Sequence, residues 1–120
     1  MENAADYARR REEQNELVLS RASLSTKRFF ALDHDAYRDG ALPKKAKELM
    51  GLVASSVLRC NDCISYHLVE AVQCGATDEE IIEALEIALV VGGSIVIPHF
   101  RHAIAFLETI DRSKHTSVTD

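Results

Sequence analysis

Residues 48–67 read ELMGLVASSVLRCNDCISYH and place a carboxylate, two thiols and an imidazole in one short stretch. Eleven residues separate the glutamate from the first cysteine, and three separate the second cysteine from the histidine. A helix turns by about 100° per residue, so it projects Cys60, Cys63 and His67 from one side. If the helix begins only at Asn61, this holds strictly for Cys63 and His67. The stretch supplies a nucleophile, a base and an acid, provided that it is helical.

The two cysteines have the spacing of a reversible disulfide. Cα atoms three residues apart in a helix are separated by about 5 Å, within the range of roughly 4.4–6.8 Å that a disulfide requires. A place at a helix start also favours the thiolate, because the free N–H groups there lower a cysteine pKa. His67 can then accept the thiol proton, and Glu48 in the preceding helix can orient the imidazole or pass the proton onward.

The same residue types are compatible with two other roles. A structural zinc site needs four ligands, so the two thiols and His67 leave the fourth position to Asp62, Glu48 or another subunit. Alternatively, the cysteines are buried side chains without chemistry. Glu48 by itself is typical of an exposed residue, because it lies about 160° from the centre of the apolar stripe of its helix. The residues alone leave these alternatives open.

Apolar residues recur with helical spacing on both sides of this stretch, and no segment alternates with the period of a strand. Pro43 suits the first turn of a helix. The helix predicted to begin there has an apolar stripe that consists of Ala46, Leu49, Met50, Val53 and Val57. A break is predicted at residues 59–62, because Asn61 and Asp62 both suit the N-cap of a new helix.

Stop and start signals continue toward the C-terminus. Gly75 suits a left-handed helix end, and residues 77–80, Thr-Asp-Glu-Glu, have the form of a capping box at the start of another helix. The glycine pair at 92–93 interrupts that helix, and Pro98 lies near the start of a last helix that reaches Ile110. The predicted fold class is all-α.

The first 37 residues are less regular. Asn3–Ser20 is rich in helix formers but has a thin apolar stripe, so we expect a helix that is peripheral or packed on another subunit. Ser20–Tyr37 carries several aromatic and aliphatic residues and predicts a short helix that covers the core.

A chain of 120 residues, 47% hydrophobic and 28% charged, is long enough for one compact domain. We expect a single helical domain over residues 1–120. Within it we expect a peripheral N-terminal helix at 1–20, a core spanning 29–110 and a flexible tail at 113–120.

The formal net charge of −5 argues against nucleic acid or an anionic membrane as partner, because such partners need a cationic surface. The basic run at 9–11, Arg-Arg-Arg, is followed by Glu12 and Glu13, which is typical of a solvated helix face. No stretch reaches the roughly 18 apolar residues needed to span a bilayer, and the start lacks a signal-peptide pattern. We therefore expect a cytoplasmic protein, in which paired cysteines more often serve redox chemistry or metal than structure.

Three residues outside this stretch also carry reactive groups. Cys74 lies about 16 Å along the helix from Cys63, too far for a disulfide, and we expect it to be a packed apolar residue. His99 and His102 share one face of the last helix. We expect them to be packed or hydrogen-bonded, with lining of the active pocket as the alternative.

The whole pattern, Glu48-(eleven residues)-Cys60-x-x-Cys63-x-x-x-His67, resembles the motif of the alkylhydroperoxidase AhpD-like group within the carboxymuconolactone decarboxylase family. The resemblance covers about residues 29–107. It implies an all-helical fold that assembles into homotrimers or hexamers, with the cysteine site near subunit contacts. The flanks that agree are residues 40–49 (GALPKKAKEL), residues 71–81 (AVQCGATDEEI) and Gly92-Gly93.

The resemblance also implies a role for each site residue. Cys63 would be the thiolate that attacks peroxide, Cys60 the resolving thiol, His67 the base and Glu48 the relay carboxylate. The well-studied peroxidases of the group often have a histidine between the cysteines, where this chain has Asp62. True carboxymuconolactone decarboxylases lack the cysteine pair, so the pair argues against lactone decarboxylation.

The leading hypothesis is a cytoplasmic thiol oxidoreductase that needs no cofactor or metal. Its substrate would be a hydroperoxide or a disulfide, and a cellular dithiol would reduce the oxidised cysteines. One alternative is a non-catalytic helical oligomer whose cysteines bind metal or sense redox state. Another is a decarboxylase or isomerase that acts on a small lactone.

Overall fold

The computed structural model describes residues 1–114, and this part of the chain contains helices and no strand. The prediction of an all-α fold is confirmed. Residues 115–120, which belong to the predicted flexible tail, lie outside the described residues. The elements are α1 (Ala4–Arg21), α2 (Leu24–Ala36), α3 (Lys44–Val57), α4 (Asn61–Gln73), α5 (Asp78–Gly92), η1 (Ser94–Val96), α6 (Ile97–Leu107) and η2 (Arg112–Lys114).

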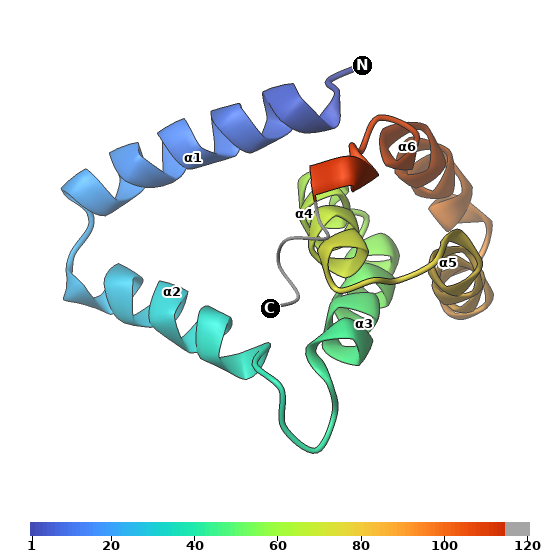
Figure 1. The fold of residues 1–120 in the computed structure, drawn as a ribbon, viewed down its shortest axis with the longest axis horizontal. Coiled ribbons are helices and arrows are strands. Elements are labelled where there is room, and N and C mark those ends of the chain that lie inside the picture. Colours follow the sequence, from blue (N-terminus) through green and yellow to red (C-terminus); the bar gives the residue numbers. More distant parts are fainter. Residues whose placement is uncertain (115–120) are drawn as a thin grey trace.

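The helices divide into a body and an arm (Figure 1). The body consists of α3 to α6, in which α3 packs against α4 and α5, and α4 packs against α6. The arm consists of α1 and α2, which run away from the body and back to it through a turn at residues 22–23. The first turns of α1 contact the body beside α4, so the arm is attached next to the start of the helix that carries the cysteines.

The core lies between α4, α5 and α6 and is made of fully buried aliphatic side chains such as Leu68 and Leu85. Tyr7 is the buried residue that α1 adds to this core. Its ring packs edge-to-face on Phe106 with a centroid separation of 5.6 Å. Its hydroxyl donates a hydrogen bond to the carbonyl oxygen of Asp62 at 3.1 Å. One side chain thus fastens the arm to the hydrophobic core and to the first turn of α4.

Helix α2 forms where it was expected but has no buried residue. Leu24, Phe29 and Leu32 are 58%, 64% and 64% exposed. The expectation that this segment covers the core is therefore wrong, because α2 lies on the arm, away from the body (Figure 1). Leu24, Phe29 and Leu32 find no partner within residues 1–114 that would bury them.

The helix ends follow the local signals closely. Gly75 has φ of 88° and ends the α4 segment, and Thr77 and Glu80 form the predicted capping box of α5. Pro98 lies in the first turn of α6, as predicted. The start of α4 is different, because Cys60 is its N-cap rather than either of the two residues that follow it.

No helix in residues 1–114 combines the length and the apolar character needed to cross a membrane.

The attachment of α1 through Tyr7 gives a testable prediction. Tyr7→Ala removes the only buried side chain of that helix, so it should lower the free energy of unfolding by about 3–5 kcal/mol. It should also raise amide hydrogen exchange along α1 more than along α5. Leu17→Ala, at a residue of the same helix that is 58% exposed, is the matched control and should leave both measurements nearly unchanged. Equal protection of α1 in the parent protein and in Tyr7→Ala would contradict this attachment.

Candidate thiol site at the start of helix α4

Cys60 and Cys63 are joined by a disulfide at the start of α4, with their Cα atoms 5.3 Å apart. Cys60 precedes the helix with extended backbone, and its Sγ accepts a hydrogen bond from the backbone N–H of Cys63 at 3.2 Å. The tight turn before it is made by Arg59, which has φ of 62°, an uncommon value for a residue with a side chain. Cys63 is exposed and Cys60 is half-buried, so Cys63 is the more accessible cysteine of the two.

His67 and Glu48 form a buried pair behind the disulfide. The Nδ1 atom of His67 lies 2.8 Å from Oε1 of Glu48, which has no exposed surface. The other carboxylate oxygen accepts a hydrogen bond from Nζ of Lys44 at 2.7 Å, and the same ammonium contacts Glu70 at 2.9 Å. Burial lowers the pKa of Lys44, but its bonds to Glu48 and Glu70 outweigh this and raise the pKa well above its ordinary value. Lys44 therefore stays charged and compensates the buried carboxylate.

The helix face that carries Glu48 differs from the one expected from the sequence. The apolar stripe left Glu48 either in solvent or against a different neighbour, and the structure shows the second arrangement. Helix α3 buries it with Leu52, Ser55 and Ser56, while Met50 of the predicted stripe is 54% exposed. The reason is that α4 folds back onto the Glu48 side of α3 and supplies the polar partner that makes its burial possible.

Gly51 makes room for the imidazole. A Cβ atom at this position would lie 2.6 Å from Cε1 of His67 and 2.8 Å from both ring nitrogens. These separations are too short for any side chain, so the absence of one lets the ring lie against α3 and reach Glu48. The motif does not specify Gly51, which is one of the eleven residues between Glu48 and Cys60. The signal in the sequence is a glycine inside a helix: it lowers helix stability by about 1 kcal/mol, which suggests that close packing requires it.

Two tyrosines flank the imidazole. The ring centroids of Tyr66 and Tyr37 lie 5.1 Å and 5.5 Å from that of His67. Burial, followed by the nearby Glu70 carboxylate, raises the pKa of Tyr66 to about 12, so its phenol stays neutral at physiological pH. The guanidinium of Arg11 lies over the ring of Tyr66, 4.2 Å from its centroid.

A cavity of about 240 Å³ opens beside Cys63 and His67. Helix α1 contributes Tyr7 and Arg11 to its lining, and α2 contributes Asp33. The arm and the body therefore enclose the exposed sulfur together. A small molecule in this cavity would have a thiol and an imidazole on one side and the side chains of the arm on the other.

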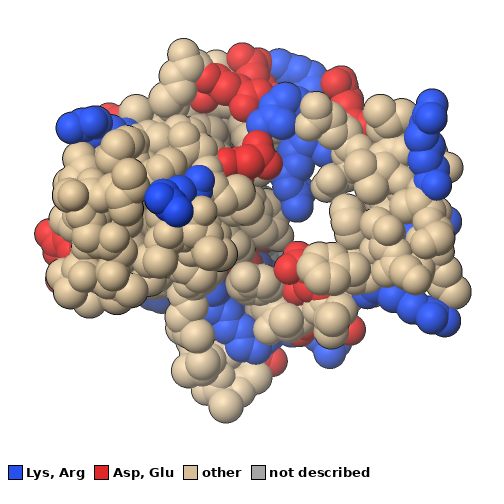
Figure 2. All heavy atoms as spheres, turned by 180° about the vertical axis from the view of Figure 1, so that it is seen from behind, with Lys and Arg blue, Asp and Glu red and all other residues tan. Residues whose placement is uncertain are grey.

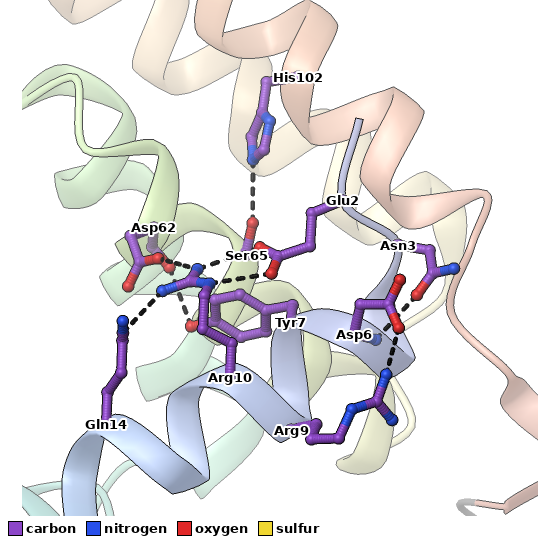
Figure 3. Close-up of polar contacts among 10 residues, drawn as sticks. All are labelled: Glu2, Asn3, Asp6, Tyr7, Arg9, Arg10, Gln14, Asp62, Ser65 and His102. Atoms are coloured by element: carbon purple, nitrogen blue, oxygen red, sulfur yellow. Dashed lines mark hydrogen bonds and ion pairs between the residues drawn. The ribbon is translucent and has the colours of Figure 1, made fainter. Parts of the chain in front are cut away.

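Asp62, between the cysteines, reaches Arg10 of the arm (Figure 3). Its carboxylate accepts a hydrogen bond from Arg10 at 2.7 Å, and Arg10 also pairs with Glu2 at 2.9 Å. The expectation that the basic run is only a solvated face is therefore wrong for Arg10 and for Arg11. It holds for Arg9, which is exposed and pairs with its neighbour on the helix.

The two histidines of α6 contact α4 from the other side. His99 Nδ1 lies 2.7 Å from Oδ1 of Asn61, and His102 Nε2 lies 2.9 Å from Oγ of Ser65 (Figure 3). Burial lowers the pKa of His102, and its ring stacks on Phe106. Neither histidine lines the cavity beside Cys63, so the hydrogen-bonded role is confirmed.

The chain is similar to known proteins in sequence and in fold. The model of the carboxymuconolactone decarboxylase family matches residues 23–108. The chain belongs to the carboxymuconolactone decarboxylase family. Among solved structures, a member of this family from Thermotoga maritima is 68% identical, with a TM-score of 0.81, and the match covers 85% of this chain and 86% of that one. That protein is described as possibly involved in an antioxidative response.

Two more distant proteins extend the comparison. The apo form of a carboxymuconolactone decarboxylase family protein from Legionella pneumophila is 28% identical, with a TM-score of 0.80, and the match covers 88% of this chain and 94% of that one. An uncharacterized protein encoded in the cox locus of Paracoccus denitrificans is 37% identical over 83 residues, which are 69% of this chain and 75% of that protein.

For this family member, the close approach at Gly51 yields a prediction. Gly51→Ala should displace the His67 ring, weaken its hydrogen bond to Glu48 and lower the free energy of unfolding by about 1–3 kcal/mol. The nitrogen chemical shifts of the imidazole in an NMR spectrum report the displacement directly. Gly40→Ala is the control, because the nearest atom to a Cβ there is Nζ of the flexible Lys47 at 3.6 Å. Unchanged His67 shifts in Gly51→Ala would show that the ring does not depend on this glycine.

Proposed function

We propose that this protein is a thiol-dependent oxidoreductase that reduces hydroperoxides at Cys63 and returns to the dithiol through a cellular dithiol reductant. The observation that supports it most is the Cys60–Cys63 disulfide, which opens on a cavity next to an imidazole held by a buried carboxylate. The description of the Thermotoga maritima relative in terms of an antioxidative response agrees with it.

The chemistry would proceed in three steps. His67 accepts the proton of the Cys63 thiol, and the thiolate attacks the terminal oxygen of the peroxide, so that an S–O bond forms and the O–O bond breaks. The leaving alkoxide takes the proton from His67 and departs as an alcohol. The Cys60 thiolate then attacks the sulfenic acid of Cys63, which forms the disulfide and releases water. A dithiol supplies two electrons and two protons to restore both thiols.

Each residue would have a distinct part in this cycle. Cys63 is the nucleophile because it is the exposed sulfur, and Cys60 resolves because it already lies one helical turn away. Glu48 orients His67 through Nδ1, which leaves Nε2 as the nitrogen that handles the thiol proton. Lys44 holds that carboxylate in place through its hydrogen bond to the second oxygen.

The test is exposure of the reduced protein to an alkyl hydroperoxide, followed by mass spectrometry. The parent protein should lose two hydrogens, and the loss should map to the peptide that carries Cys60 and Cys63. Cys63→Ser should abolish the reaction, and Cys60→Ser should stop it at a sulfenic acid that dimedone traps. Glu48→Gln should slow the oxidation by about 10-fold to 100-fold.

Cys74→Ser is the matched control, because Cys74 is the free cysteine of the described chain and burial raises its pKa. It should react as the parent does. Peroxide-inert thiols together with tightly bound zinc in the purified protein would refute the oxidoreductase and favour the non-catalytic alternative.

We also propose that the protein is a homotrimer or homohexamer in which the arm packs on a neighbouring copy. The support is the apolar surface of α2, where Phe29 and Leu32 share one face and are each 64% exposed. An isolated chain would leave this surface in water.

Sedimentation measurements should therefore give a trimer or a larger assembly. A Phe29→Glu, Leu32→Glu double variant should dissociate it, because charge on an apolar contact costs more than the contact contributes. Lys27→Glu, on the opposite face of α2, should leave the assembly intact. A parent protein that sediments as a monomer would contradict this proposal.

A further inference from the structure

The structure separates the three arginines at positions 9–11 by their partners. Arg9 pairs with Asp6 on the surface of α1 (Figure 3). Arg10 is held between two carboxylates, as described above. For Arg11, no carboxylate lies within ion-pair distance in the described part of the chain. Two of the three charges are thus neutralised by the protein, and the third is not.

Arg11 lies where a small molecule would approach the exposed thiol. It lines the cavity of about 240 Å³ beside Cys63. It also lines two adjoining hollows, one of about 590 Å³ between α1 and α4 and one of about 360 Å³ between α1 and α2. Tyr66 lines the same three spaces. Figure 2 shows the molecule hollowed between the arm and the body, with charged side chains at the edge of the hollow.

The position of the guanidinium suits the binding of an anion. It lies over the ring of Tyr66, 4.2 Å from the centroid, and within residues 1–114 it makes no hydrogen bond or ion pair. Its N–H groups can therefore bind the two oxygens of a carboxylate. Because Arg11 is half-buried, its charge is less screened by solvent than that of Arg9. The cation therefore has the geometry of a carboxylate receptor next to a reactive sulfur.

We propose that Arg11 binds a carboxylate of the molecule that Cys63 reduces, so that the substrate is a small, carboxylate-bearing hydroperoxide. This inference rests on the proposed thiol chemistry for the nature of the reaction, and on Arg11 for the charge of the substrate. Arg11 is accordingly a specificity residue, which selects the substrate without exchanging protons or electrons with it.

The other charges around the cavity set the size of the expected effect. Asp62 is neutralised by Arg10, and Glu48 is neutralised by Lys44. Asp33, which is exposed on α2, faces the cavity as the remaining carboxylate and opposes an anion there. Replacement of Asp33 by asparagine should therefore act in the opposite direction to loss of the arginine.

The experiment compares two alkylating probes of nearly equal size, iodoacetate, which is an anion, and iodoacetamide, which is neutral. With each, the Cys63 thiolate forms an S–C bond as the C–I bond breaks and iodide leaves. The rate of each reaction at Cys63 is measured by peptide mass spectrometry on the reduced full-length protein. The ratio of the two rates cancels the reactivity of the thiolate itself and reports only the preference for negative charge.

Arg11→Gln should lower the iodoacetate to iodoacetamide ratio by about 5-fold to 10-fold, the effect of one cation at close range in a partly solvated cavity. Arg11→Lys should keep most of the ratio, because it keeps the charge. Asp33→Asn should raise the ratio. Arg9→Gln is the matched control and should change it by less than about 2-fold, since that charge is exposed and paired.

Two outcomes would overturn the inference. Equal slowing of both probes by Arg11→Gln would mean that Arg11 acts on the thiolate, and an equal change of the ratio in Arg9→Gln would mean that only the overall charge of α1 matters. Oxidation of Cys63 by a carboxylate-bearing alkyl hydroperoxide and by its methyl ester is the second arm. Oxidation at equal rates would leave the proposed function standing and refute the role of Arg11. Inertness toward both peroxides, with the iodoacetate preference intact, would refute peroxide reduction and leave the anion site standing.

Discussion

Burial of the Glu48 carboxylate is the constraint on which the rest of this site depends. A carboxylate without exposed surface loses its hydration, and only ion pairs and hydrogen bonds of good geometry offset that loss. Lys44 satisfies one oxygen and His67 the other. Because Lys44 lies on the same helix, the imidazole is the partner that must be brought from outside, and the turn at Arg59 brings it. The position of the His67 ring beside Cys63 therefore follows from the requirement to pair a buried carboxylate.

Local signals predicted the helices well, whereas the buried face of α3 required knowledge of the whole fold. The helix end at Gly75 depends on the backbone conformation of one residue, and the cap at Thr77 depends on a partner three residues away. Because both signals are local, they can be recognised in the sequence alone. The apolar stripe of α3 did not identify the most buried face of this helix, because that face carries Glu48 and is buried through polar pairing with α4. Periodicity measures hydrophobicity and carries no information about a hydrogen bond between residues that are nineteen positions apart.

Two residues that shape the cavity were missed for related reasons. Gly51 reads as a weak spot in a helix until the ring that needs its space is known. Arg11 reads as one of three equal charges, and only the fold shows that its neighbours find carboxylates while it faces Tyr66 and the thiol. The motif identified Glu48, Cys60, Cys63 and His67, whereas Gly51 needs the packing of α3 on α4 to be recognised and Arg11 comes from a helix far away along the chain.

The place of the disulfide within a single helical turn limits what its oxidation can signal. Cys60 and Cys63 are neighbours whether or not they are bonded, since the Cys60 sulfur caps the same turn that carries Cys63. A bond between them links two residues of one helical turn and ties no helix to another. Oxidation of this cysteine pair therefore offers no direct means of moving one helix relative to another.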